Sequence, residues 1–253
     1  MTRGTWRARL AAPAVLSVIL AAASATAAAA EPPTATPPAA PLKIGIIGTG
    51  EIGSRLARLW VAAGHEVLMS SRHPDQLKGL AASLGSRARV GTPREAAEFG
   101  EVVVVSVPYG ALPQVGRDLK AELAGKVVLD TCNPYPSRDG EMAVEARRIS
   151  TGVADPKFLP GVRLVRAFNA INSGDLSGEA HRAGEPIAIP LAGDDAQAKA
   201  RVSTFVESLG LRPLDAGPLL MARALENAGL LEISLANHAI KHVNFALGVN
   251  TVS

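Results

Sequence analysis

Cysteine is almost absent from this chain of 253 residues, and neither sign of charge dominates it. Cys132 is the only cysteine, so no internal disulfide can form. We interpret it as a buried structural thiol. The net charge of +3 equals the three arginines nearest the N-terminus, Arg3, Arg7 and Arg9, and the remainder has no run of lysine and arginine. These absences exclude a disulfide-stabilised fold and argue against a nucleic acid as partner.

The first 30 residues are typical of a signal peptide. Arginines precede an uncharged stretch of 21 residues, Leu10–Ala30, which ends in alanines that fit a small-residue cleavage site. We therefore expect export to the periplasm or the exterior, with no stable membrane span once residues 1–30 are removed. An uncleaved membrane anchor is one alternative, and a start codon placed too far upstream, which would leave a cytoplasmic protein, is another. Residues 31–41 contain five prolines and predict an extended linker.

From Lys43 onward, short β-rich runs alternate with helical patterns, which predicts an α/β fold with a doubly wound, mostly parallel sheet. The run Glu101–Val107 is apolar on both faces, as expected for a parallel strand buried under helices. Further strands are expected at 43–48, 66–70, 87–90, 126–131, 163–168, 186–191 and 211–214. Helices are expected at 53–63, 75–84, 93–98, 112–123 and 196–209.

The glycine-rich segment between the first expected strand and the first expected helix has the spacing G-x-G-x-x-G. Its residues are Gly48, Thr49, Gly50, Glu51, Ile52 and Gly53. In this context the glycines permit a tight turn, close approach of a pyrophosphate and close packing of helix on strand. The free N–H groups at the start of the helix then bind the phosphates. The segment therefore predicts a dinucleotide site, with a glycine-rich turn that binds nothing as the alternative.

The end of the second expected strand discriminates between the two nicotinamide cofactors. An acidic residue there would bind the free ribose 2′-hydroxyl of NAD, but this sequence has Ser70, Ser71 and Arg72. Two hydroxyl groups and a guanidinium suit a 2′-phosphate. We therefore predict NADP as cofactor, and the alternative is a surface arginine that happens to follow a strand.

Two further strand ends are candidates for the cofactor site, because doubly wound sheets bind ligands where their strands end. Val107, Pro108 and Tyr109 close the fourth expected strand, and Asn133 and Pro134 follow the fifth. Ordinary turn formation is the alternative for both segments. Asn169, after the next strand, could offer an amide to the nicotinamide.

A helical C-terminal segment is expected at 216–253, after a Rossmann domain at 42–215. Its longest helical stretch, 218–247, is too apolar for a solvated helix, and Leu231, Leu235, His238 and His242 align on one stripe. We expect this stripe to pack in a homodimer. For the two histidines, packing is favoured over a substrate-facing donor or a metal ligand. No third ligand is evident, so we expect no metal site.

At these motifs the sequence resembles the deazaflavin-dependent NADP oxidoreductase family, which shares its nucleotide domain with the reductase domains of membrane metalloreductases. The matching segments are IIGTGEIGSRLA, VLMSSR, VSVPYGA and, above all, GLRPLDAGPL at Gly210–Leu219, followed by Glu226. Gln76 stands where the family tends to place a lysine. The contacts that the resemblance implies are Thr49, Gly50, Glu51 and Ile52 with the pyrophosphate, Ser71 and Arg72 with the 2′-phosphate, and Val107 and Ala167 with the nicotinamide end.

Together these features predict an NADP-dependent oxidoreductase that transfers hydride between the nicotinamide and a flavin-like or deazaflavin acceptor, such as coenzyme factor 420 or a flavin. Hydride transfer needs mainly position and electrostatics, so no catalytic side chain is assigned. Tyr109 and the stripe of His238 and His242 are the candidates for contacting the acceptor ring. The alternatives are an NADPH-dependent reductase of another small acceptor, such as an imine or a quinone, and a non-catalytic NADP-binding protein.

Overall fold

The computed structural model describes residues 41–176 and 186–238. The expected signal peptide at 1–30 and all of the expected linker except Pro41 therefore lie outside the described residues. So do His242 and the part of the expected C-terminal helix that follows His238. No helix within the described ranges is long and apolar enough to cross a membrane.

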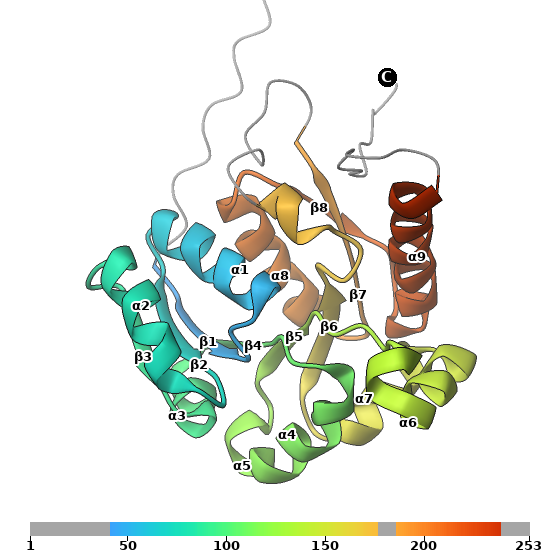
Figure 1. The fold of residues 1–253 in the computed structure, drawn as a ribbon, viewed down its shortest axis with the longest axis horizontal. Coiled ribbons are helices and arrows are strands. Elements are labelled where there is room, and N and C mark those ends of the chain that lie inside the picture. The colour runs from blue at the N-terminus through green and yellow to red at the C-terminus, as the bar shows by residue number, and fades with distance from the viewer. Residues whose placement is uncertain (1–40, 177–185, 239–253) are drawn as a thin grey trace, which may run out of the picture. The chain divides into compact units, whose positions relative to one another are not determined.

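One eight-stranded sheet, in the order β3-β2-β1-β4-β5-β6-β7-β8, organises the described residues. Neighbouring strands are parallel except for the antiparallel pair of β6 and β7. Figure 1 shows the sheet running from β3 on the left towards β7, with α9 beside that end. The strands are β1 Lys43–Ile47, β2 Glu66–Ser70, β3 Ala88–Gly91, β4 Val102–Val105, β5 Val127–Asp130, β6 Arg163–Ala167, β7 Ala188–Gly193 and β8 Arg212–Asp215.

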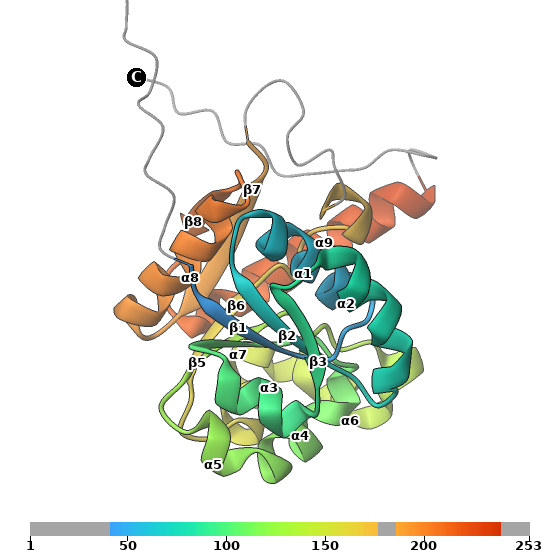
Figure 2. The same cartoon turned by 90° about the vertical axis from the view of Figure 1, so that its left-hand side faces the viewer.

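Helices cover both faces of this sheet, with α1, α2 and α8 on one side and α3, α4 and α5 on the other (Figure 2). The α-helices are α1 Glu51–Ala62, α2 Lys78–Leu84, α3 Pro93–Phe99, α4 Leu112–Asp118, α5 Lys120–Leu123, α6 Pro136–Ile149, α7 Thr151–Phe158, α8 Ala196–Ser208 and α9 Ala222–His238. Short 3₁₀ turns are η1 Pro74–Leu77, η2 Tyr109–Ala111, η3 Ser173–Leu176 and η5 Leu219–Met221.

The core lies in two layers because strand side chains alternate between the faces. In β4, Val102 and Val104 pack in the layer under α1 and α8, whereas Val103 and Val105 pack in the layer under α3, α4 and α5. All four valines are at most 1% exposed. This two-sided burial explains why β4 is continuously apolar. The fold is a Rossmann-type doubly wound α/β sheet with a C-terminal helix, as predicted.

Three helical segments differ from the sequence-based expectation. The helix expected at 112–123 is two helices, because Leu119 leaves helical geometry with φ −119° and ψ 21°. The C-terminal helix begins at Ala222, after the 3₁₀ turn η5. Helices α6 and α7 were not predicted. Their pattern is broken at Gly140, whose φ is 63°, and by Pro156 inside α7, so no uninterrupted helical period is present.

Candidate functional site

The glycine-rich turn joins β1 to α1, and its three glycines are needed for different reasons. Gly48 has φ 91°, and a Cβ there would lie 2.4 Å from the Ser106 carbonyl oxygen. A Cβ on Gly53 would lie 2.4 Å from the Gly48 oxygen. A Cβ on Gly50 would meet nothing within 4 Å. The first and third glycines are therefore required by the packing of the turn, whereas the second faces open space that a ligand can enter.

The N-terminus of α1 has free N–H groups beside this space. Gly50 is its N-cap residue and supplies no side-chain acceptor to the first turn. The N–H and the hydroxyl of Thr49 both donate to the Ser70 carbonyl oxygen on the neighbouring strand, at 3.1 Å each, so neither is free to donate to a ligand. Glu51 points away and accepts a hydrogen bond from the Ser173 hydroxyl. The backbone of the turn and of Ile52, rather than these side chains, is thus available to an anion.

The three residues at the end of β2 have separate roles. Ser70 is fully buried, and its hydroxyl donates to the Ile46 carbonyl oxygen at 2.8 Å, so it is not the phosphate donor that the sequence suggested. Ser71 Oγ accepts a hydrogen bond from the His73 N–H at 2.9 Å, which leaves the hydroxyl proton free to donate. Arg72 is exposed and forms no ion pair with another described residue.

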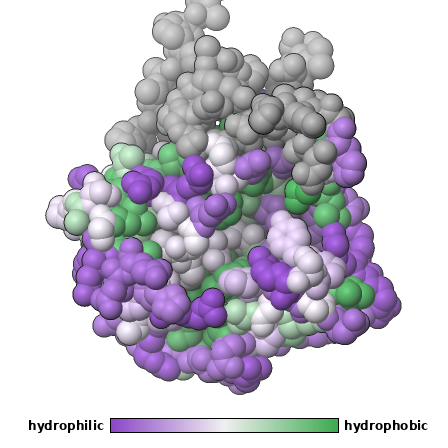
Figure 3. Space-filling view, viewed as in Figure 1, coloured by the Kyte–Doolittle hydropathy of each residue, from purple (hydrophilic) through white to green (hydrophobic). Residues whose placement is uncertain are grey.

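A cavity of about 710 Å³ lies between this strand end and α4, and its size suits a cofactor. Figure 3 shows the face that contains the strand ends, where the middle is pale and near neutral in hydropathy between more hydrophilic rims. His73 lines the cavity, although nothing in the sequence marked it. Among the lining residues are Gly48, Thr49, Gly50, Ser71, Arg72, His73, Gln76, Leu77, Ser106, Val107, Pro108, Ala111, Gln114 and Val115.

Asn169 follows β6 and carries an unsatisfied buried amide. The residue is only 5% exposed, and its side-chain nitrogen and oxygen are both buried without a hydrogen-bond partner. The preceding residue, Phe168, has φ 59°, a conformation that non-glycine residues adopt at a cost. Unpaired buried amide atoms are unfavourable, although Asn169 lines neither of the two pockets. A carboxamide group would offer both the donor and the acceptor that these two atoms lack. Ala167, in contrast, is fully buried within the sheet.

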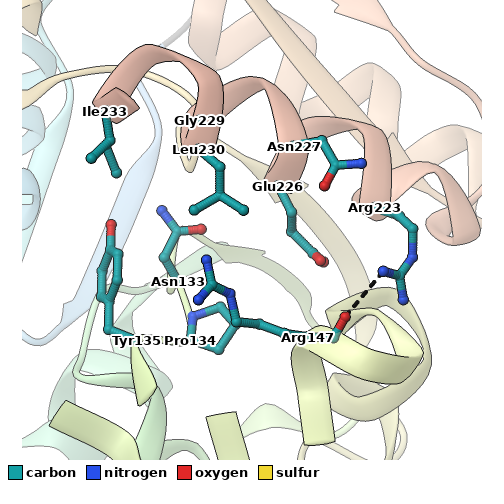
Figure 4. Close-up of a pocket in the computed structure, with 10 residues that line it drawn as sticks. All are labelled: Asn133, Pro134, Tyr135, Arg147, Arg223, Glu226, Asn227, Gly229, Leu230 and Ile233. Atoms are coloured by element: carbon teal, nitrogen blue, oxygen red, sulfur yellow. Dashed lines mark hydrogen bonds between the residues drawn. The ribbon is translucent and has the colours of Figure 1, made fainter. Parts of the chain in front are cut away.

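A smaller pocket of about 100 Å³ lies beyond Asn169, between α6, α9 and the loop after β5. Asn133 links this loop to the end of β6, because its amide donates to the Asn169 carbonyl oxygen at 2.7 Å. Figure 4 shows the Arg147 guanidinium directed between the loop and α9. The lining residues are Asn133, Pro134, Tyr135, Arg147, Arg223, Glu226, Asn227, Gly229, Leu230 and Ile233.

Glu226 and Arg223 fasten α9 to the neighbouring helices. Glu226 Oε1 accepts hydrogen bonds from the Ser150 hydroxyl and from both the N–H and the hydroxyl of Thr151. Arg223 donates to the carbonyl oxygens of Arg147 and Arg148 at 3.0 and 2.9 Å, in the last turn of α6. These bonds make α9 one wall of the smaller pocket.

Asp139 ties together the loops after β4 and β5. Its Oδ1 accepts from the Gly110 N–H and its Oδ2 from the Tyr135 N–H, at 3.0 Å each, and Arg138 donates to both oxygens. Burial alone would raise the pKa of Asp139, but these hydrogen bonds outweigh it and lower the pKa below the ordinary value. No motif around Asp139 predicts this role.

Tyr109 lies under the site rather than in it. It is fully buried, and its hydroxyl donates to Asp155 Oδ1 at 2.6 Å. Asp155 Oδ2 and Asp130 Oδ2 both accept from Arg166, at 3.0 and 2.8 Å, in a fully buried network. Burial and the adjacent Asp155 raise the pKa of Tyr109. The expectation that Tyr109 contacts the acceptor ring is therefore wrong, because the hydroxyl is used inside the protein.

Cys132 and His238 also lie outside the two pockets. Cys132 is buried, and burial followed by the nearby Asp130 raises the pKa of its thiol well above the ordinary value. His238 is exposed, and its ring contacts the Ser234 carbonyl oxygen at 3.0 Å. In the ranges 41–176 and 186–238, no three histidine, cysteine, aspartate or glutamate side chains are grouped so that they could hold a metal ion.

Comparison with known proteins identifies the family of this chain. Residues 43–134 match the model of the family described as NADP oxidoreductase, coenzyme F420-dependent. The chain is 30% identical to an F420-dependent NADP reductase of Methanothermobacter marburgensis over 213 residues, which covers 77% of this chain and 92% of that protein. It belongs to the F420-dependent NADP oxidoreductase family. As a member it is an NADP-dependent oxidoreductase, and the cavity and the open space at Gly50 fit that cofactor.

Two other similarities are informative about extent and fold. The chain is 32% identical to the metalloreductase STEAP3 of Rattus norvegicus over 197 residues, which are 75% of this chain but only 36% of that protein. It therefore spans about a third of the metalloreductase. A solved structure titled as an F420-dependent NADP-reductase from Arthrobacter sp. FB24 is 24% identical with a TM-score of 0.64, covering 78% of this chain and 94% of that one, and shows the same fold.

Proposed function

We propose that the protein uses NADPH to reduce a planar ring acceptor of the flavin or deazaflavin type. One observation carries the proposal: the cofactor cavity and the smaller pocket lie at the ends of adjacent strands, β4 and β5, with the unsatisfied amide of Asn169 at the next strand end. Bound NADPH supplies a hydride from its nicotinamide ring. The names of the relatives, F420-dependent NADP reductases, support the same class of acceptor.

The protein's own groups have positioning roles in this proposal. The pyrophosphate lies in the open space beside Gly50, and the first N–H groups of α1 donate hydrogen bonds to it. Ser71 and Arg72 hold the 2′-phosphate. Asn169 pairs with the carboxamide and thereby fixes which face of the nicotinamide is presented to the smaller pocket. This assignment satisfies both buried amide atoms of Asn169.

The described side chains favour a ring acceptor over a carbonyl or imine. Reduction of a carbonyl or an imine usually uses a positioned proton donor. Tyr109 and Cys132 are committed inside the protein. Tyr135 is half-buried in the wall of the smaller pocket, and its hydroxyl forms no hydrogen bond with another described residue. A ring acceptor needs mainly stacking and alignment beside the nicotinamide, and no positioned proton donor.

Stopped-flow absorbance at the NADPH band tests this function with a panel of coenzyme F420, flavins, quinones and cyclic imines. We expect rapid oxidation with the deazaflavin or a flavin, and a slower hydride transfer in Asn169→Leu with NADPH affinity largely retained. Leucine keeps the size of the side chain but removes both amide atoms. Turnover with imines or quinones alone would refute the ring-acceptor proposal, and tight NADPH binding without any oxidation would favour a non-catalytic protein.

We further propose that the protein is a homodimer through α9. Exposed apolar residues on and just before this helix, Leu220, Met221, Leu230, Leu231 and Ile233, are 39–65% exposed. Burial in a symmetric interface would remove them from water. Light scattering of the purified protein is expected to give a dimer mass, and Leu231→Glu a monomer. A monomer before substitution would contradict the proposal.

We also propose, from the N-terminal sequence, that the protein is exported. Its charge pattern and alanine-rich end favour cleavage after about 30 residues. Mass spectrometry of the protein isolated from its natural host is expected to give a mature chain that begins near Glu31. A full-length cytoplasmic chain would contradict export.

A further inference from the structure

The smaller pocket has a wall of arginine side chains, and these differ in whether they have a partner within the protein. Four arginines belong to it or adjoin it, and one of these, Arg138, donates to the Asn133 carbonyl oxygen and is paired with Asp139 at 2.8 Å. Arg148 pairs with Glu145 at 2.7 Å on the exposed side of α6, and Arg223 is bound to the last carbonyl groups of that helix. The Arg147 side chain has no hydrogen bond or ion pair with another described residue, and it lines the pocket.

The helix terminus does not explain the position of Arg147. A basic residue in the last turn of a helix often compensates the partial negative charge of the terminal carbonyl groups. Here Arg223 already donates to those carbonyls from α9. Figure 4 shows the Arg147 guanidinium turned away from that end and towards Asn133 and Pro134. The Arg147 guanidinium is therefore available to bind a ligand group in the pocket.

The pocket also contains one acidic residue, Glu226, which is largely committed elsewhere. Its Oε1 receives three hydrogen bonds from Ser150 and Thr151, so the carboxylate is held towards α7. Two guanidinium groups against one hydrogen-bonded carboxylate leave the wall electropositive. The side-chain amides of Asn133 and Asn227 add polar groups to the same lining.

The size of the pocket limits what it can hold. A cavity of about 150 Å³ accepts a benzene molecule, so about 100 Å³ is too small for a fused ring system. It suits a compact group of a few heavy atoms. An anionic group of this size, such as a phosphate or a carboxylate, matches the planar fork of a guanidinium.

We propose that this pocket is a subsite for an anionic group carried by the hydride acceptor, with Arg147 as its recognition residue. The inference rests on the proposed function, because it places the ring of the acceptor between Asn169 and the subsite. The acceptor would then be a ring compound with a phosphate or carboxylate side group. Neutral rings would be accepted less well.

Riboflavin and flavin mononucleotide test this directly, since they share a ring and differ in one phosphate. Their dissociation constants are measured by flavin fluorescence with saturating NADP⁺, which fills the cofactor cavity and prevents reduction. We expect wild type to bind flavin mononucleotide more tightly than riboflavin. Arg147→Gln should weaken the phosphorylated flavin by about tenfold or more, the scale of a charge-assisted hydrogen bond, and leave riboflavin unchanged.

Arg148→Gln is the matched control, because it removes the same charge from the adjacent residue on the exposed side of the helix. It should keep the preference for flavin mononucleotide. A quinone sulfonate compared with its neutral quinone extends the test to a different ring and acid. Equal affinities for the charged and neutral partners in wild type, no binding of either flavin, or equal losses in both arginine variants would each overturn the subsite.

The two proposals can fail separately. If flavins are bound with an Arg147-dependent phosphate preference but NADPH is never oxidised, the ring-reductase function is wrong and the anion subsite stands. If both flavins are reduced with the same KM and Arg147→Gln changes neither KM, the function stands and the subsite is wrong. Thermal unfolding of each variant verifies that the fold is intact.

Discussion

Replacing Tyr109 by phenylalanine should destabilise the protein and leave the chemistry almost unchanged. The substitution removes one hydroxyl from a fully buried network and keeps the ring, whose edge contact with Phe158 has a centroid distance of 6.2 Å. Asp155 Oδ1 loses the hydrogen bond that it accepts from Tyr109 at 2.6 Å, while Asp155 Oδ2 still accepts from Arg166. The carboxyl group is then only half satisfied in a site without solvent.

The size of the effect follows from this unsatisfied acceptor. Leaving one buried polar group without its partner costs about 1–3 kcal/mol. For a folded domain of about 200 residues, each kcal/mol lowers the melting temperature by about 2–4 °C, so the expected decrease is about 2–12 °C. Burial already raises the pKa of Asp155, and loss of the Tyr109 hydrogen bond should raise it further.

Calorimetric melting together with steady-state kinetics measures both consequences. Tyr135→Phe is the matched control, because Tyr135 is the other of the chain's two tyrosines and its ring lines the smaller pocket. We expect Tyr109→Phe to melt earlier with kcat within a factor of about two, and Tyr135→Phe to melt normally and to change turnover by about tenfold or less. A thousandfold loss of kcat in Tyr109→Phe with an unchanged melting temperature would show that its hydroxyl reaches the reacting atoms.

Three other predictions concern the cofactor site and the acid response. Arg72→Ala should weaken NADPH by about tenfold or more and spare NADH, since the lost contact is charge-assisted; equal losses in calorimetric titration would refute the 2′-phosphate role. Gly50→Val should fold normally and lose NADPH binding, and normal cofactor affinity in this variant would mean that the turn binds nothing. Gly48→Ala should instead unfold at a lower denaturant concentration, because Gly48 has φ 91° and, unlike Gly50, no space for a Cβ. The hydrogen bond from Arg163, followed by that from the Ala198 N–H, lowers the pKa of Asp195 below its ordinary value of 3.8. This carboxylate therefore stabilises the fold fully above pH 3.8, and progressively less as the pH falls below that value. Denaturant titrations between about pH 5 and pH 2 should therefore show a smaller acid-induced loss of stability in Asp195→Asn than in wild type, and parallel losses would contradict the assignment.

The sheet and the cofactor turn could be predicted because their signals are local. Valine runs such as Val102–Val105 and the glycine spacing at Gly48–Gly53 depend on burial and on backbone geometry within a few residues. The absence of an acid after β2 predicts Ser71 and Arg72 as the 2′-phosphate residues, and this stays a prediction. The same pattern could not distinguish Ser70, whose hydroxyl donates to the Ile46 carbonyl oxygen 24 positions earlier in the sequence.

The smaller pocket could not be predicted because it depends on contacts between distant segments. Arg147 reaches the pocket only because α9 is held on α6 and α7, through hydrogen bonds that span 75 or 76 positions. The helix that carries Arg147 is interrupted at Gly140, so its period was not evident. Tyr109 was misassigned for the same reason, since its partner Asp155 lies 46 positions away on α7.

The single carboxylate of Asp139 has a consequence for how two ligands affect one another. It accepts hydrogen bonds from the loop that borders the cofactor cavity at Gly110 and from the loop that borders the smaller pocket at Tyr135, so we expect a displacement of one loop to affect the other. Linkage requires the effect to be reciprocal: the factor by which bound NADP⁺ alters the affinity of a ligand for the smaller pocket must equal the factor by which that ligand alters NADP⁺ affinity. Asp139→Asn, which loses the charge that Arg138 binds, should bring that common factor closer to one, so that each ligand titrates as though the other were absent.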